Sequence, residues 1–260
     1  MRTTPIKPHS KLCSKLISIV LICFVCNSYA QDDSDNEDSW NFIIAPYLLS
    51  PNIDGDIGLG DVIIDVGVDP NDIFSHLDFG AMLFFEMNKG NWAITFDGLY
   101  MNLGKHGVTP IALRDIKADI SQLELEFIGF YSVTDWLDLG IGGRVSVIKQ
   151  GLYVGAGLLV DEIDVSGSNT WFDPLIASRA SFTANEKWHF RLHTDIGGFG
   201  LGSDLAWQVH PALGYQFSPT FEFALGYRWL SMEYDKGSGA DYYLYDLIDS
   251  GLELSFRFHL

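Results

Sequence analysis

The strongest constraint on how this chain folds is an alternation of apolar and polar side chains over stretches of about ten residues. It is clearest between Trp188 and Ile196. There Trp188, Phe190, Leu192, Thr194 and Ile196 share one face, and His189, Arg191, His193 and Asp195 share the other. A period of two puts successive side chains on opposite faces of a β-strand. The segment therefore predicts a strand with one apolar and one polar side.

The same alternation recurs from Trp40 onward and predicts ten strands joined as antiparallel hairpins. They are expected at residues 40–49, 78–88, 92–103, 117–132, 137–149, 171–183, 188–200, 205–217, 221–234 and 245–259. Eight strands is the competing count, because Pro46 and Pro211 fall within expected strands and proline cannot donate to a ladder. An even number of strands brings both ends of a barrel to the same, periplasmic side.

The connections alternate in length, as they do in outer-membrane barrels. Four short turns are each followed at once by an aromatic residue: Trp92, Trp136, Trp188 and Phe221. Aromatic side chains at one level are typical of a membrane interface. The other connections are longer, at about 50–77, 104–116, 150–170 and 235–244, with a short exception at 201–204. The pattern predicts a closed, up-and-down transmembrane β-barrel with short periplasmic turns and long extracellular loops.

The positions of the cationic residues favour a membrane barrel over a soluble sandwich. Lysines are expected in turns, in loops or at strand ends: Lys89, Lys105, Lys117, Lys149, Lys187 and Lys236. Five arginines lie within expected strands on the polar face: Arg144, Arg179, Arg191, Arg228 and Arg257. A lysine or arginine that faces lipid at mid-bilayer costs about 2–4 kcal/mol. No expected strand places one on its apolar face.

The N-terminus predicts export. Arg2, Lys7, Lys11 and Lys15 precede a short apolar run, and cleavage is expected after Ala30. Residues 1–30 are therefore a predicted signal peptide, 31–39 a disordered acidic leader and 40–260 the barrel. All three cysteines, Cys13, Cys23 and Cys26, lie in the segment to be removed. The mature chain is thus expected to contain no disulfide, cysteine nucleophile or cysteine-metal site.

Charge narrows the possible partners. The chain has 16 basic and 34 acidic residues and a net charge of −18, and the expected signal peptide holds four of the basic residues. Nucleic acid is excluded as an expected partner, because phosphate binding needs a basic surface. The expected mature chain contains no apolar stretch of the roughly 20 residues that a helical span needs.

The last expected strand alternates Leu252, Leu254, Phe256, Phe258 and Leu260 up to the carboxyl terminus. It resembles the C-terminal assembly signal of outer-membrane barrels, although that signal usually ends in Phe or Trp. Over its full length the mature chain resembles the small OmpA/OmpW-like barrels and related uncharacterised outer-membrane proteins. The resemblance implies a place in the bacterial outer membrane, contact with its lipid and lipopolysaccharide, and recognition of this strand by the assembly machinery.

The polar faces of the strands predict a network inside the barrel lumen. Its expected members are Glu86, Asp97, Glu124, Glu126, Arg144, Arg179, His189, Arg191, His193, Asp195, Arg228, Glu253 and Arg257. Acids and bases mixed in so narrow a barrel would pair and fill it, although a narrow conductive path stays open as an alternative. His189 and His193 could ligate a metal, but adjacent Arg191 argues against a cation site. No metal and no cofactor are predicted.

Catalytic motifs are not visible in the sequence. Outer-membrane proteases of the omptin type and barrel lipid A deacylases share the expected architecture, but their motifs have no match here. The acidic first loop lacks the spacing of a defined calcium loop. We therefore expect a barrel without enzymatic activity, with a structural, adhesive or loop-mediated binding role. A narrow solute channel and a rim enzyme that acts on lipid or peptide are the alternatives.

Overall fold

The computed structural model describes residues 39–69, 77–108, 115–154 and 163–260. The predicted signal peptide and nearly all of the acidic leader lie outside these residues, and so do His76 and the end of the first expected loop. In the described ranges no helix has the length and apolar character needed to cross a membrane.

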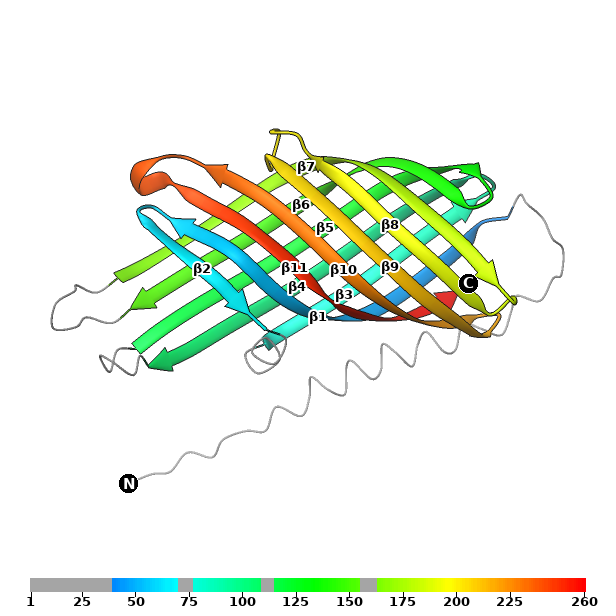
Figure 1. Cartoon of the computed structure of the whole chain (residues 1–260), viewed down its shortest axis with the longest axis horizontal. Helices are drawn as coiled ribbons and strands as arrows, with labels where there is room; N and C mark the ends of the chain where they lie inside the picture. Colours follow the sequence, from blue (N-terminus) through cyan, green and yellow to red (C-terminus); the bar gives the residue numbers. More distant parts are fainter. Residues whose placement is uncertain (1–38, 70–76, 109–114, 155–162) are drawn as a thin grey trace, which may run out of the picture. The chain divides into compact units, whose positions relative to one another are not determined.

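Nearly all of the described chain is β-strand (Figure 1). The strands are β1 (Asn41–Leu59), β2 (Val62–Val68), β3 (Leu77–Lys89), β4 (Trp92–Val108), β5 (Asp115–Thr134), β6 (Leu137–Val154), β7 (Ile163–Ala184), β8 (Trp188–Gly198), β9 (Leu205–Ser218), β10 (Phe221–Lys236) and β11 (Tyr243–His259). One short 3₁₀ turn, η2 (Gly239–Asp241), lies between the last two strands.

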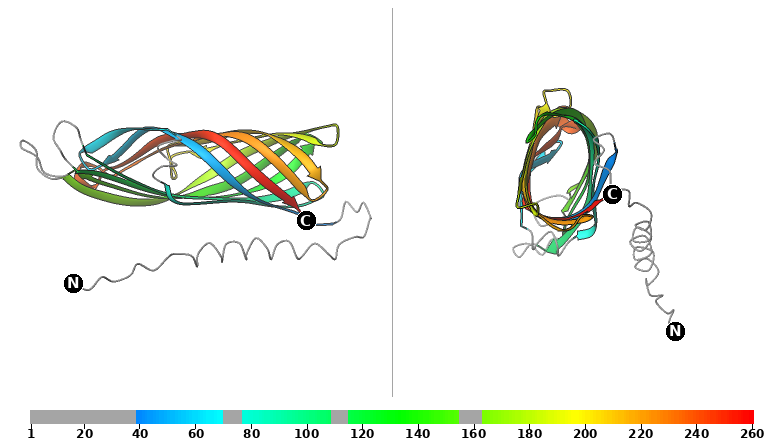
Figure 2. Two further views of the ribbon diagram at one scale, coloured as in Figure 1. Left: turned by 90° about the horizontal axis from the view of Figure 1, so that it is seen from below. Right: turned by 90° about the vertical axis from the view of Figure 1, so that its right-hand side faces the viewer.

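The strands close into an antiparallel, up-and-down barrel. From β3 to β11 each strand pairs with the next in sequence, and β11 pairs back onto β1 from Ile43↔His259 to Leu59↔Tyr243. Phe42 and Leu260 also exchange two backbone hydrogen bonds, of 3.2 and 2.9 Å. Viewed from its end, the ring is closed and oval (Figure 2). Among the described residues ten strands form the ring, so the predicted count of ten is confirmed and the alternative of eight is wrong.

Strand β1 changes its partner along its length. It pairs with β3 over Asn41–Pro46 and with β2 over Ile53–Leu59. Prolines lie where ladders are interrupted: the β1–β3 pairing ends at Pro46, and the β9–β10 pairing skips Pro211. The reason is that proline has no N–H to donate. Proline therefore reduced the pairing of these strands without removing them from the barrel.

The strands extend further on the extracellular side than the sequence pattern indicated. β1 continues to Leu59 and forms a hairpin with β2, where the first long loop was expected. β4 continues to Val108 and β6 to Val154, so Lys105 and Lys149 lie within strands. Beyond the bilayer the outer face no longer has to be apolar. The alternation therefore fades there, although the backbone ladder continues.

Large apolar side chains cover the outside of the barrel. Six examples, all between 46% and 74% exposed, are Leu83, Phe96, Leu125, Ile141, Ile176 and Leu225. The four predicted interface aromatics lie next to the short turns, and each contacts an aromatic ring of a neighbouring strand. The pairs are Trp92–Tyr131, Trp136–Phe182, Trp188–Tyr215 and Phe221–Phe258, with centroids 4.8, 5.7, 4.9 and 5.4 Å apart. An apolar belt edged by aromatics is the surface that a bilayer stabilises.

This belt makes a direct prediction for Ile141, which is 74% exposed on β6. We expect Ile141→Arg to destabilise the folded barrel by about 2–4 kcal/mol in lipid vesicles, because the guanidinium would face hydrocarbon. The matched control is Ile63→Arg on the extracellular β1–β2 hairpin, where the isoleucine is 59% exposed. The control should change stability by no more than about 0.5 kcal/mol. Urea titration of the folded, heat-modifiable gel band measures both, and equal effects would contradict the proposed position of the bilayer.

Candidate functional site

The polar side chains of the strands gather inside the barrel. Along β5, for example, Gln122, Glu124, Ile128 and Phe130 are all buried, whereas alternate residues such as Leu125 point outward. The same period of two runs through the other strands. The inner surface is therefore built from charged groups drawn from opposite walls, and these groups meet in several separate clusters.

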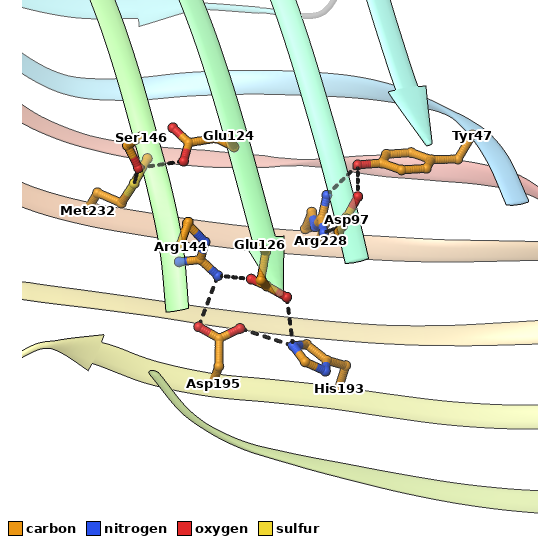
Figure 3. Close-up of polar contacts among 10 residues, drawn as sticks. All are labelled: Tyr47, Asp97, Glu124, Glu126, Arg144, Ser146, His193, Asp195, Arg228 and Met232. Carbon is orange, nitrogen blue, oxygen red and sulfur yellow. Dashed lines mark hydrogen bonds and ion pairs between the residues drawn. The ribbon is translucent and has the colours of Figure 1, made fainter. Parts of the chain in front are cut away.

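The central cluster is organised by Arg144 of β6, whose side chain is 1% exposed (Figure 3). Its Nη2 donates to Glu126 Oε2 at 2.5 Å and to Asp195 Oδ1 at 3.0 Å. His193 Nε2 lies 3.0 Å from Asp195 Oδ2 and 3.9 Å from Glu126 Oε1. One arginine thus holds two carboxylates, while one histidine faces the other oxygen of each.

A second cluster joins β1, β4 and β10 (Figure 3). Tyr47 Oη donates to Asp97 Oδ1 at 2.7 Å, and Arg228 Nη1 donates to Tyr47 Oη at 3.0 Å. Arg228 also pairs directly with Asp97 through its other terminal nitrogen. Charge-assisted hydrogen bonds of this kind are the strong ones in a barrel interior. They connect strands that lie 181 residues apart in the sequence.

Two further clusters lie nearer the short turns. Arg179 donates at 2.8 Å to both Asp138 and Glu86. Arg191 forms a two-pronged pair with Glu222, while Arg257 Nε lies 3.7 Å from that carboxylate. Arg191 therefore pairs with Glu222, whereas the nearby His193 and Asp195 belong to the central cluster.

The remaining predicted lumen residues have weaker or more local contacts. Glu124 accepts a hydrogen bond of 2.5 Å from Ser146. Glu253 lies 3.5 Å from His210. His189 Nδ1 lies 3.2 Å from the hydroxyl of Thr183. These three residues therefore lie at the edges of the main ion-pair clusters, where Glu124 acts on Arg144 and Glu253 acts on Arg228 through charge.

The structure adds lumen residues that were not singled out from the sequence. Tyr47 joins the second cluster, and Asp249 accepts a hydrogen bond of 3.0 Å from Gln122. Asp173 is fully buried and accepts bonds from Ser203 N, Ser203 Oγ and Trp171 Nε1 at 2.6, 2.9 and 3.1 Å. Strand parity could have identified both aspartates, since Asp173 shares a face with Arg179 and Asp249 shares one with Glu253.

On the extracellular side of these clusters lies a layer of large apolar side chains, here called the aromatic layer. It consists mainly of Ile148, Trp171, Tyr234, Tyr243, Tyr245 and Leu247, all of them buried. Trp171 of β7 stacks on Tyr234 of β10 with centroids 4.1 Å apart and planes 9° apart, and lies 5.8 Å from the Tyr245 ring. The two intervening strands end below this level, β8 at Gly198 and β9 at Leu205, so Trp171 and Tyr234 meet beyond the β8–β9 hairpin. Tyr243 of β11 reaches further, because its Oη donates to the Ile148 carbonyl of β6 at 3.4 Å.

The opposite walls also approach closely just above the aromatic layer. A Cβ added to Gly167 of β7 would lie 2.4 Å from Leu59 Cδ2 of β1, well inside van der Waals contact. A larger residue at this position would make the leucine side chain shift. The aromatic layer and this contact together place apolar side chains in the extracellular part of the lumen.

The polar half of the lumen contains a cavity of about 80 Å³. That is room for several water molecules. Its lining includes Glu126, His193, His210, Arg228 and Glu253. Several of these side chains have buried polar atoms with no hydrogen-bond partner among the described residues, among them His210 Nε2 and Glu253 Oε2. Bound water is the expected partner for such atoms.

Comparison with known proteins identifies the fold but no family. No protein-family profile matches the sequence, and no curated protein does. Among solved structures, the outer-membrane protease OmpT from Escherichia coli matches with a TM-score of 0.51 and 11% identity, over 88% of this chain and 99% of OmpT. The translocator domain of the autotransporter NalP from Neisseria meningitidis matches with a TM-score of 0.46 and 10% identity, over 96% and 95% of the two chains.

Together with the closed ring, the apolar belt and the aromatic girdle, the likeness to OmpT defines the class of this protein. It is a small integral β-barrel of the bacterial outer membrane. At 11% identity the comparison concerns the fold, so the protease activity named for OmpT is not transferred to this chain.

Proposed function

We propose that this protein is a non-conducting outer-membrane barrel whose working surface is its extracellular end. The observation that carries the proposal is the aromatic layer, a buried apolar cluster to which β6, β7, β10 and β11 all contribute side chains. Ions cannot pass a packed apolar layer without losing their hydration. Below it, the paired charges fill most of the polar half. A structural, adhesive or ligand-binding role fits such a barrel better than transport through it.

The extracellular end carries a row of negative charges. Four exposed carboxylates, Asp65, Asp56, Asp246 and Glu233, stand directly opposite one another in register across β2, β1, β11 and β10. Like charges that face each other across strands repel. This end therefore favours cationic groups or cation-bridged lipopolysaccharide over polyanions such as nucleic acid.

Planar-bilayer recording tests the proposal. We expect the purified barrel to produce no stable single-channel steps after insertion, whereas a known porin inserted under the same conditions does. Heat-modifiable gel migration of the same sample shows that the protein is folded. Steps that change when Arg191 or Glu124 is neutralised would instead support the alternative, a narrow solute channel, and would contradict the proposal.

A further inference from the structure

Three ligand-type atoms converge in the central cluster, on the side away from Arg144. Glu126 uses Oε2 and Asp195 uses Oδ1 to accept from Arg144. Glu126 Oε1 and Asp195 Oδ2 are therefore turned toward His193 Nε2, at 3.9 and 3.0 Å (Figure 3). The ligand atoms of these three residues all lie within 4.8 Å of one another.

These separations are close to those of a metal site. A divalent ion that binds nitrogen and oxygen ligands at about 2.0–2.1 Å in a tetrahedron sets its ligands about 3.3 Å apart. Small side-chain rotations would bring the three atoms to such spacings. The cavity beside Glu126 and His193 has room for a water molecule as the fourth ligand.

The charges of the cluster also admit a cation. Two buried carboxylates face one guanidinium, which leaves one negative charge in excess when His193 is neutral. Arg144 contacts the carboxylate oxygens that point away from His193, so it orients both groups without occupying the converging atoms. Partners of this kind commonly fix the ligands of metal sites. Arg191 does not interfere, because it is paired with Glu222.

We propose that Glu126, His193 and Asp195 bind a divalent transition-metal ion inside the lumen. One imidazole with two carboxylates suits Zn²⁺ or a similar ion better than Mg²⁺ or Ca²⁺, which prefer oxygen ligands alone. The site lies below the aromatic layer, in a cavity that is also lined by Arg179 and Arg191, near the short turns. The proposal is independent of the proposed function at the extracellular end.

Isothermal titration of the full purified barrel with Zn²⁺, after removal of metals by a chelator, tests this site. An excess of Ca²⁺ in the buffer occupies the exposed carboxylates. We expect one saturable Zn²⁺ per chain. Changing a residue that only supports a metal ligand typically weakens metal binding by roughly 10–100-fold. His193→Asn and Glu126→Gln remove ligands themselves, so each should weaken Zn²⁺ binding by more than that.

The matched control is His210→Asn. His210 lines the same cavity and lies beside Glu253, but it is outside the converging group. This variant should bind Zn²⁺ within about twofold of the unaltered protein, and Co²⁺ should give the visible absorption of a low-symmetry site in both. Each variant is first shown to be folded by its heat-modifiable migration. The proposal is overturned if no saturable binding occurs, or if the His193 and His210 variants lose it equally.

Discussion

Replacing Arg144 by methionine is expected to destabilise the folded barrel by about 3–5 kcal/mol, because it leaves buried carboxylates without their cation. Arg144 is 1% exposed and donates to both Glu126 and Asp195. Each carboxylate would then have to remain charged in a medium of low polarity or take up a proton. Urea titration of the folded gel band in lipid vesicles measures the loss.

A rescue experiment separates charge from packing at Arg144. The triple variant Arg144→Met, Glu126→Gln and Asp195→Asn removes the cation and both anions together. It should recover part of the lost stability, since no unpaired buried charge remains, while the two buried amides still cost about 1–3 kcal/mol each where they lack hydrogen-bond partners. A single Arg144→Met variant within about 1 kcal/mol of the unaltered protein would show that the cluster does not hold the barrel together.

The second large effect is expected at Trp171 in the aromatic layer. Trp171→Ala should cost about 3–5 kcal/mol, the range for deleting a buried aromatic side chain. The change removes the stacking on Tyr234 and the hydrogen bond to Asp173. Trp171→Phe keeps an aromatic ring but loses the donor, so its cost should be smaller. The same urea titration gives the free energies of unfolding of the unaltered protein, Trp171→Ala and Trp171→Phe.

The control for Trp171 is another tryptophan that faces lipid. Trp188 is 43% exposed in the aromatic girdle, and its replacement by alanine should cost about 1 kcal/mol or less. If the Trp171 and Trp188 variants lose equal stability, the aromatic layer is not a packed core. The proposal that this layer closes the lumen would then have lost its main physical support.

The sequence predicts the wall of the barrel better than its interior. The ten strands could be predicted because every strand in a bilayer needs an apolar outer face. Apolar residues therefore recur with a period of two between Trp40 and Phe258. Outside the bilayer that demand ends. The extensions of β1, β4 and β6 were therefore read as loops.

The alternation along each strand also separates inward-facing from outward-facing residues. It does not predict which inward-facing groups contact one another. Arg144 could have paired with any acid at its depth in the lumen. Its contact with Asp195, 51 residues away, depends on the tilt and register of the strands. The sequence does not single out Tyr47, because a tyrosine on an apolar strand is expected in a core, and its hydroxyl gains a role only from the positions of Asp97 and Arg228.

The sequence by itself thus indicated that the chain forms a barrel of about ten strands, with eight as the alternative, and which faces meet lipid, because these follow from local alternation. The tertiary structure decided the partners of each charge, the convergence of Glu126, His193 and Asp195, and the packing of Trp171 with its apolar neighbours. These depend on side chains from opposite walls that meet only when the ring closes. No local pattern in one strand carries that information.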